Sequence, residues 1–108
     1  MSHLTAHVLD AAAGVPAEGV RITLAAGDGI VLATAETDAN GRVNELGPDR
    51  LESGEYAVTF GSGAYFAERG TRSFHPRITV LFTVDAAQQH YHIPLLLSPF
   101  AYTTYRGS

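Results

Sequence analysis

Short runs of apolar and β-branched residues recur along the chain, separated by residues that favour turns. Val20, Ile22 and Leu24 alternate with polar neighbours, and residues 55–60 repeat the pattern. A period of two is typical of a strand with one buried face. The same reading applied to the whole chain predicts eight short strands, at residues 4–10, 20–24, 30–37, 42–44, 55–60, 78–84, 91–97 and 101–105.

The segments between these runs define how the strands connect. Residues 27–29, Gly-Asp-Gly, predict a hairpin between the second and third runs. Only residues 64–69 favour a helix, and they hold little more than one turn. Strands without a βαβ rhythm indicate an all-β antiparallel sandwich. A length of 108 residues predicts one domain, 1–108.

Charged residues are absent from residues 86–105, a stretch of twenty residues between Asp85 and Arg106. A transmembrane helix needs about this length. The stretch nevertheless contains two glutamines, two prolines, His90 and His92. We therefore predict a pair of strands buried on both faces, in a core or a subunit interface.

The overall composition excludes several classes of function. The formal charge is −4, and all seven basic residues are arginine, which argues against a nucleic-acid partner. The absence of cysteine excludes disulfides, thiolate zinc sites and thiol catalysis. The first residues lack the basic and apolar regions of a signal peptide, so we expect a cytoplasmic protein without a membrane partner.

His90 and His92 are the first candidates for chemistry. They are two residues apart in a predicted strand, so their imidazoles lie on the same face. Both could be ordinary solvated or core histidines. They also form half of a metal site, but no third ligand is obvious, and we expect no metal.

Other candidates have ordinary explanations when taken alone. His7 fits a surface position on a strand, Arg42 an exposed hairpin end, and residues 105–108 a frayed terminus. The aromatic residues before that end favour an ordered tail. The sequence lacks a serine elbow, a P-loop and a dinucleotide fingerprint.

For several other aromatic and histidine residues we expect a structural role and no part in a functional site. Tyr65, Phe66, Phe74 and Phe82 are expected in the core. We read His3 as an N-terminal surface residue and His75 as structural or surface.

Taken together, these segments resemble the 5-hydroxyisourate hydrolases, also called transthyretin-related proteins. The closing Tyr105-Arg106-Gly107-Ser108 is the most specific match, and the run His90-Tyr91-His92-Ile93-Pro94-Leu95-Leu96-Leu97 is nearly as strong. The remaining matches extend nearly from end to end and comprise residues 4–10, 14–17, 37–42, 73–76 and 98–99.

The resemblance implies a transthyretin-like (prealbumin-like) sandwich of two four-stranded sheets with one short helix. It further implies a homotetramer, a dimer of dimers, with active sites in a channel at the dimer–dimer interface. The implied reaction is hydrolysis of a lactam-type C–N bond of 5-hydroxyisourate to 2-oxo-4-hydroxy-4-carboxy-5-ureidoimidazoline, in urate degradation, without metal or cofactor.

The family's site maps onto matching residues of this sequence. The resemblance implies His7, Arg42 and His92 as catalytic, with Tyr105 and Ser108 joining His7 and Arg42 in substrate binding. A supporting set, expected around them, consists of His90, Arg106 and Gly107. His92 or His7 is the candidate base, and Arg42 the candidate for holding an oxyanion.

Two alternatives from other classes remain. The first is a transthyretin-like carrier of a small apolar ligand, without catalysis. The second is a metal-binding module formed by His90 and His92.

Overall fold

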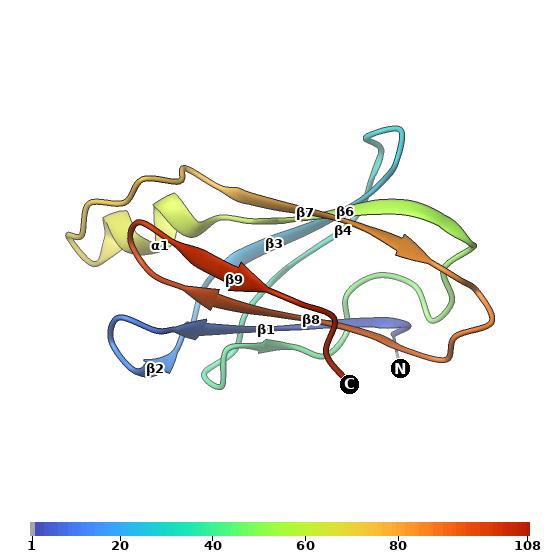
Figure 1. The fold of residues 1–108 in the computed structure, drawn as a ribbon, viewed down its shortest axis with the longest axis horizontal. Coiled ribbons are helices and arrows are strands. Elements are labelled where there is room, and N and C mark those ends of the chain that lie inside the picture. The colour runs from blue at the N-terminus through green and yellow to red at the C-terminus, as the bar shows by residue number, and fades with distance from the viewer. Residues whose placement is uncertain (1) are drawn as a thin grey trace.

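Two β-sheets pack face to face in the computed structural model, which describes residues 2–108 (Figure 1). In the first sheet the strand order is β2-β1-β8-β9, and β5 also pairs with β1; in the second it is β4-β3-β6-β7. The elements are β1 (Leu4–Asp10), β2 (Val15–Pro16), β3 (Arg21–Ala26), β4 (Val31–Glu36), β5 (Arg42–Val43), β6 (Gly54–Phe60), α1 (Ser62–Glu68), β7 (Ile78–Val84), β8 (Tyr91–Leu97) and β9 (Tyr102–Thr104).

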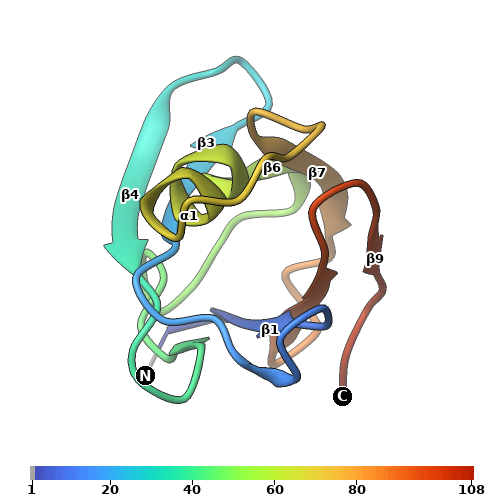
Figure 2. The same ribbon diagram turned by 90° about the vertical axis from the view of Figure 1, so that its left-hand side faces the viewer.

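The two sheets face each other across the sandwich (Figure 2). The inward side chains of both sheets form one buried apolar cluster. Ile22 and Leu24 of β3, and Val58 and Phe60 of β6, are fully buried, as their alternation predicted. The inward face of β8 supplies Tyr91, Ile93, Leu95 and Leu97 to the same cluster. Burial on alternate positions therefore fixes which face of each strand looks outward.

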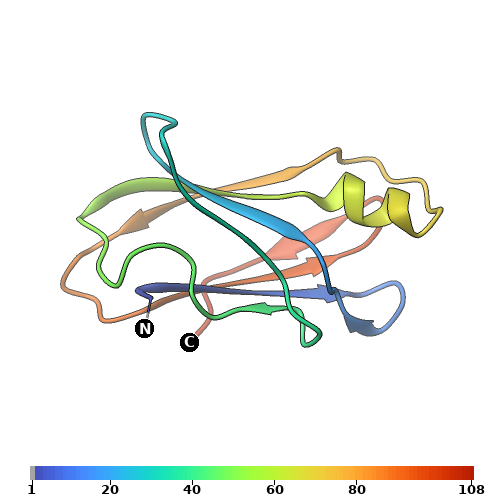
Figure 3. The same ribbon diagram turned by 180° about the vertical axis from the view of Figure 1, so that it is seen from behind.

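The central pair of the first sheet is parallel. β1 and β8 run in the same direction, with Leu4 opposite Tyr91 and Asp10 opposite Leu97. Figure 3 shows the two strands side by side in the lower layer. The even-numbered residues of β1 and the odd-numbered residues of β8 face the core. The other positions, including Thr5, His7 and His92, face outward.

The helix α1 covers the end of the sandwich near the end of β1 (Figure 1). Its Tyr65 donates a hydrogen bond of 2.8 Å to Asp10 Oδ2, and the Arg69 guanidinium lies 3.7 Å from the centre of the Tyr65 ring. Burial, then the hydrogen bond to Asp10, raises the pKa of Tyr65 above its usual value. This cluster anchors the C-terminal end of β1, the strand that carries His7.

Most of the predicted architecture is confirmed, with corrections. The sandwich, the short helix and the hairpin at residues 27–29 are present. The first sheet, however, has five strands where four were expected, because the short β2 and β5 both pair with β1. The expected antiparallel sandwich is confirmed for most strand pairs, and the exception is the parallel pair β1 and β8.

Two side-chain assignments are also wrong. His3, expected at the surface, is 1% exposed: its Nε2 donates to Gln88 O and its Nδ1 accepts from Leu51 N. Phe74, expected in the core, is 71% exposed and stacks edge-on against His75. His3 is buried because the chain near residues 51 and 88 supplies both of its polar partners.

In the single chain the uncharged stretch is buried mainly on its inward face, and on the outer face of β8 Pro94 is buried while His92 and Leu96 are half-buried. The inward side of β8 belongs to the core, whereas Tyr102 of β9 is 42% exposed in the single chain. The expected burial of both strands on both faces therefore requires an interface. No helix within residues 2–108 is long and apolar enough to cross a membrane.

Replacing Gly41 with Ala should destabilise the fold more than replacing Gly14. Both glycines have φ of +74°, which costs an L-residue about 1–2 kcal/mol. Nothing lies within 4 Å of the Cβ position at Gly14, but at Gly41 a Cβ would overlap the carbonyl oxygen of Val8. Urea unfolding should show an additional loss of about 1–3 kcal/mol for G41A. Equal losses in the two variants would contradict this contact.

Candidate active site

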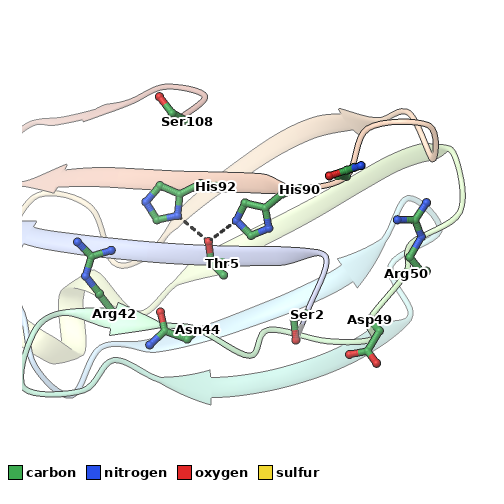
Figure 4. A pocket seen from close by; sticks show the side chains of 10 residues that line it. Ser2, Thr5, Arg42, Asn44, Asp49, Arg50, His90, His92 and Ser108 are labelled. Carbon is green, nitrogen blue, oxygen red and sulfur yellow. Dashed lines mark hydrogen bonds between the residues drawn. The ribbon is translucent and has the colours of Figure 1, made fainter.

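On the outer face of β1 and β8, two histidines, His90 and His92, lie around Thr5 (Figure 4). Thr5 lies opposite His92 in the parallel register, and His7 follows on the same face of β1. Thr5 Oγ1 lies 2.7 Å from His92 Nδ1 and 3.0 Å from His90 Nε2. The shared face predicted for His90 and His92 is confirmed by their common partner.

A tight turn places Arg42 beside these histidines. Asp38 Oδ1 accepts hydrogen bonds from the backbone N–H groups of Asn40 and Arg42, at 2.9 and 3.0 Å. The turn then pairs with β1, where Arg42 lies opposite His7. The Arg42 guanidinium is directed toward His92 (Figure 4), and within residues 2–108 no hydrogen bond holds it elsewhere. Its donors are therefore available to a ligand.

The C-terminal tail returns along the outside of β8. Gly107 N donates a hydrogen bond of 2.8 Å to His92 O, and Thr104 Oγ1 donates to Pro94 O. A Cβ at Gly107 would lie 2.6 Å from His92 Cδ2 and 3.0 Å from Pro94 Cγ. Only glycine lets the tail approach the His92 ring this closely, so the tail and the ring position each other.

The predicted catalytic and binding residues line a single groove of about 370 Å³. Its wall includes all of the following: His7, Arg42, His92, Tyr105 and Ser108. A larger open groove of about 900 Å³ shares Arg42, His92 and Ser108 with it and extends past Thr5 and His90. Segments far apart in the sequence thus meet around one surface depression.

The three predicted supporting residues are divided by the structure. Gly107 lines the smaller groove and His90 the larger one. Arg106 lines a third cavity, of about 260 Å³ beside β7, which is also lined by His92 and Tyr105, and its guanidinium lies 4.5 Å from the centre of the Tyr91 ring. Arg106 therefore holds the tail against the sheet through a cation–π contact.

The electrostatics of the site favour a neutral His92. Burial, followed by the positive charge of Arg42 and the neighbouring His7 and His90, lowers the pKa of His92 below its usual value. His7 Nε2 lies 3.0 Å from Asn40 O, and because a carbonyl only accepts, this nitrogen carries the proton. The site thus combines a neutral imidazole with a fixed cation.

No group of three or more His, Asp or Glu side chains that could hold a metal ion occurs in the part of the chain that the structure describes. His90 Nε2 and His92 Nδ1, one nitrogen of each ring in the predicted pair, both bond to the Thr5 hydroxyl.

Sequence reasoning missed three residues that build the site. Thr5 bridges two histidines, Asp38 orders the Arg42 turn, and the Asn40 carbonyl orients His7. A signal for Thr5 was present, because it precedes His7 by two residues and so shares its face. Asp38 and Asn40 carry the usual signature of a turn, which does not reveal what the turn positions.

The fold and groove define a class of protein: a β-sandwich that presents imidazole and guanidinium groups on the outer face of one sheet. The model of the family described as HIUase/Transthyretin matches residues 4–107. The chain belongs to this family.

Relatives in the family include proteins named 5-hydroxyisourate hydrolase. The chain is 45% identical to a probable 5-hydroxyisourate hydrolase of Schizosaccharomyces pombe, covering 97% of this chain and 90% of that protein. It is 42% identical to the 5-hydroxyisourate hydrolase of Mus musculus, covering 99% and 96%.

Solved structures similar to this chain include a hydrolase and a transthyretin. The 5-hydroxyisourate hydrolase of Klebsiella pneumoniae superimposes with a TM-score of 0.91 at 38% identity, covering 99% of this chain and 100% of that one. Sea bream transthyretin in complex with thyroxine gives a TM-score of 0.91 at 35% identity, covering 97% and 94%.

The imidazole of His92 should titrate below the ordinary histidine value of about 6.5 in the folded protein. Burial and the charge of Arg42 disfavour the imidazolium. NMR titration of the His92 ring protons measures the midpoint, with the urea-unfolded chain as control. The substitution R42Q removes one of the two main causes and should raise the midpoint. A folded-state midpoint at or above the unfolded one would contradict this account.

Proposed function

We propose that this protein is a 5-hydroxyisourate hydrolase. The observation that carries the proposal is that one groove is lined by His7, Arg42 and His92 together with the chain end at Ser108. Relatives that bear the name 5-hydroxyisourate hydrolase match over nearly the full length of the chain. The substrate is a small molecule, and a groove of about 370 Å³ suits one.

His92 acts as the general base in this proposal. Its lowered pKa keeps the ring neutral near pH 7, so that it can accept a proton from water. The hydroxide attacks the lactam carbonyl of the substrate, the C–N bond breaks, and the proton passes from His92 to the leaving nitrogen. Water is thereby added across the bond, with no oxidant, metal or cofactor in the step.

Arg42 stabilises the oxygen on which negative charge develops. Its guanidinium remains charged and offers a planar set of donors. Because no described residue engages these donors, they can turn fully to the substrate.

His7, Tyr105 and Ser108 bind and orient the substrate. The His7 ring is held by its bond to the Asn40 carbonyl, which leaves Nδ1 as an acceptor toward a ligand. Tyr105 and Ser108 supply hydroxyls on the wall formed by the tail.

The working form in this proposal is a homotetramer, a dimer of dimers, with the groove at the dimer–dimer interface. Large apolar side chains exposed in the single chain support an interface; they include Leu81 at 74%, Phe100 at 62% and Tyr105 at 57%. The cytoplasmic location stays a prediction from the sequence.

A small-ligand carrier is the second candidate, since the fold also matches sea bream transthyretin in complex with thyroxine. A carrier of an apolar ligand needs an apolar channel. The groove here presents His7, Arg42 and His92, whose polar atoms would lose hydration without gaining partners. The lining therefore favours catalysis.

The purified protein should accelerate the loss of 5-hydroxyisourate absorbance when the compound is generated from urate by urate oxidase. No metal is added, and a parallel sample contains EDTA. Decay at the spontaneous rate, in the presence of folded protein, would exclude the hydrolase function and leave the carrier as the remaining candidate.

The variants H92N and R42Q should each lower kcat/KM by on the order of 10² or more, because one lacks the base and the other the oxyanion donor. R21Q is the matched control, since Arg21 is an exposed residue of β3 in the other sheet. Circular dichroism and size-exclusion chromatography verify that fold and assembly persist. Wild-type rates in H92N or R42Q would refute the assigned roles.

A further inference from the structure

One hydroxyl connects the two histidines at the end of β8. Thr5 Oγ1 lies 2.7 Å from His92 Nδ1 and 3.0 Å from His90 Nε2 (Figure 4). Thr5 projects from the outer face of β1, where the parallel register sets it opposite His92. The mechanism above uses His92 alone and gives neither Thr5 nor His90 a task.

The number of hydrogens restricts how these bonds can be made. A hydroxyl donates one hydrogen, and each nitrogen of a neutral imidazole either donates or accepts. If Thr5 donates to one ring, the other ring must donate to Thr5. If both rings donated, the Thr5 hydrogen would have no acceptor within residues 2–108. The arrangement that pairs all three groups within the protein therefore runs in one direction, from one histidine through Thr5 to the other.

We propose that His90, Thr5 and His92 form a proton relay in which Thr5 and His90 are positioning residues acting through His92. The inference rests on the hydrolase function proposed above. In the resting state His92 Nδ1–H donates to Thr5 Oγ1, and the Thr5 hydroxyl donates to His90 Nε2. The hydrogen bond at one imidazole nitrogen decides which nitrogen carries the proton. The lone pair of His92 is thereby left on Nε2, on the side of Arg42 (Figure 4).

The relay also allows the positive charge that forms on His92 during catalysis to move to His90. When His92 Nε2 takes a proton from water, its Nδ1 proton passes to Thr5 Oγ1, and the Thr5 hydroxyl proton passes to His90 Nε2. One positive charge leaves His92 and arrives at His90, and no group is oxidised or reduced. The reverse transfer accompanies delivery of the His92 Nε2 proton to the leaving nitrogen.

The surrounding charges favour this direction. Arg42 pairs with His7, and His7 with Pro94, so Arg42 lies closer along β8 to His92 than to His90. The groove around His90 is lined by both an acidic and a basic residue, Asp49 and Arg50. Transfer to His90 therefore moves the positive charge away from Arg42, to a position whose lining carries charges of both signs.

The first test separates the Thr5 hydroxyl from the shape of its side chain. T5V keeps the branched shape and should lower kcat by about tenfold to a hundredfold with little change in KM, as for a base in the wrong tautomer. T5S restores a hydroxyl and should recover most of the loss. T34V, at an exposed threonine of β4 in the other sheet, is the matched control. A T5V variant with the wild-type kcat, or a T5S variant as slow as T5V, would overturn the relay.

The second test separates positioning from proton storage. H90Q places an amide where the Nε2 of His90 lies, so it keeps a partner for Thr5 but cannot take a proton. It should lower kcat and change the pH profile of kcat while KM stays close to that of the wild type. A wild-type kcat and pH profile in H90Q would refute proton storage by His90.

The third test is independent of activity. Imidazole ¹⁵N NMR of the wild-type protein should show neutral His92 protonated at Nδ1, and T5V should lose this preference. Protonation of wild-type His92 at Nε2 instead would overturn the relay even if the enzyme is active. Conversely, an inactive wild-type protein would sink the proposed function, whereas the tautomer would still report on the relay.

Discussion

The parallel pairing of β1 with β8 is the constraint on which the site depends. It sets Thr5 opposite His92 and His7 opposite Pro94. Because the inward residues of both strands are locked into the core, the register cannot slip by one residue without turning the core outward. The positions of the histidines are therefore fixed by the burial of apolar residues on the opposite face of the same strands.

Two backbone approaches complete the site from outside this pair. The turn ordered by Asp38 brings Arg42 against β1, and the tail hydrogen-bonds to His92 through Gly107. At both places a glycine permits the close approach: Gly41 against Val8, and Gly107 against the His92 ring. Surface segments thus form the groove on the outside of the small sandwich, and the packed core stays intact.

Much of this arrangement could be predicted from the sequence, because alternation and turn residues are local signals. They located β1, β8 and the inward faces of β3 and β6. They could not show that β1 pairs in parallel with β8, since strand direction depends on the path of the whole chain. For the same reason the burial of His3 was missed, as its partners lie near residues 51 and 88.

The site residues were predicted through resemblance and in-phase spacing, and the structure brings His7, Arg42, His92, Tyr105 and Ser108 to one groove. Thr5 escaped notice because a threonine on a strand is common and is explained by β-propensity alone. Its importance becomes visible only when the register shows which two rings it touches. Arg106, expected only as a supporting residue, contacts Tyr91 and lines a neighbouring cavity that includes His92 and Tyr105.

The separation of core face from outer face explains how one fold can serve different functions. The chain superimposes equally well on a named hydrolase and on a transthyretin in complex with thyroxine. Thr5, His7 and His92 contribute nothing to the packed interior, so these positions can change without loss of the core. What decides function in this architecture is the set of polar groups displayed on the outer face of β1 and β8, with the tail that closes over it. In this chain that set consists of an imidazole with a lowered pKa, a guanidinium, and a hydroxyl joining two imidazoles.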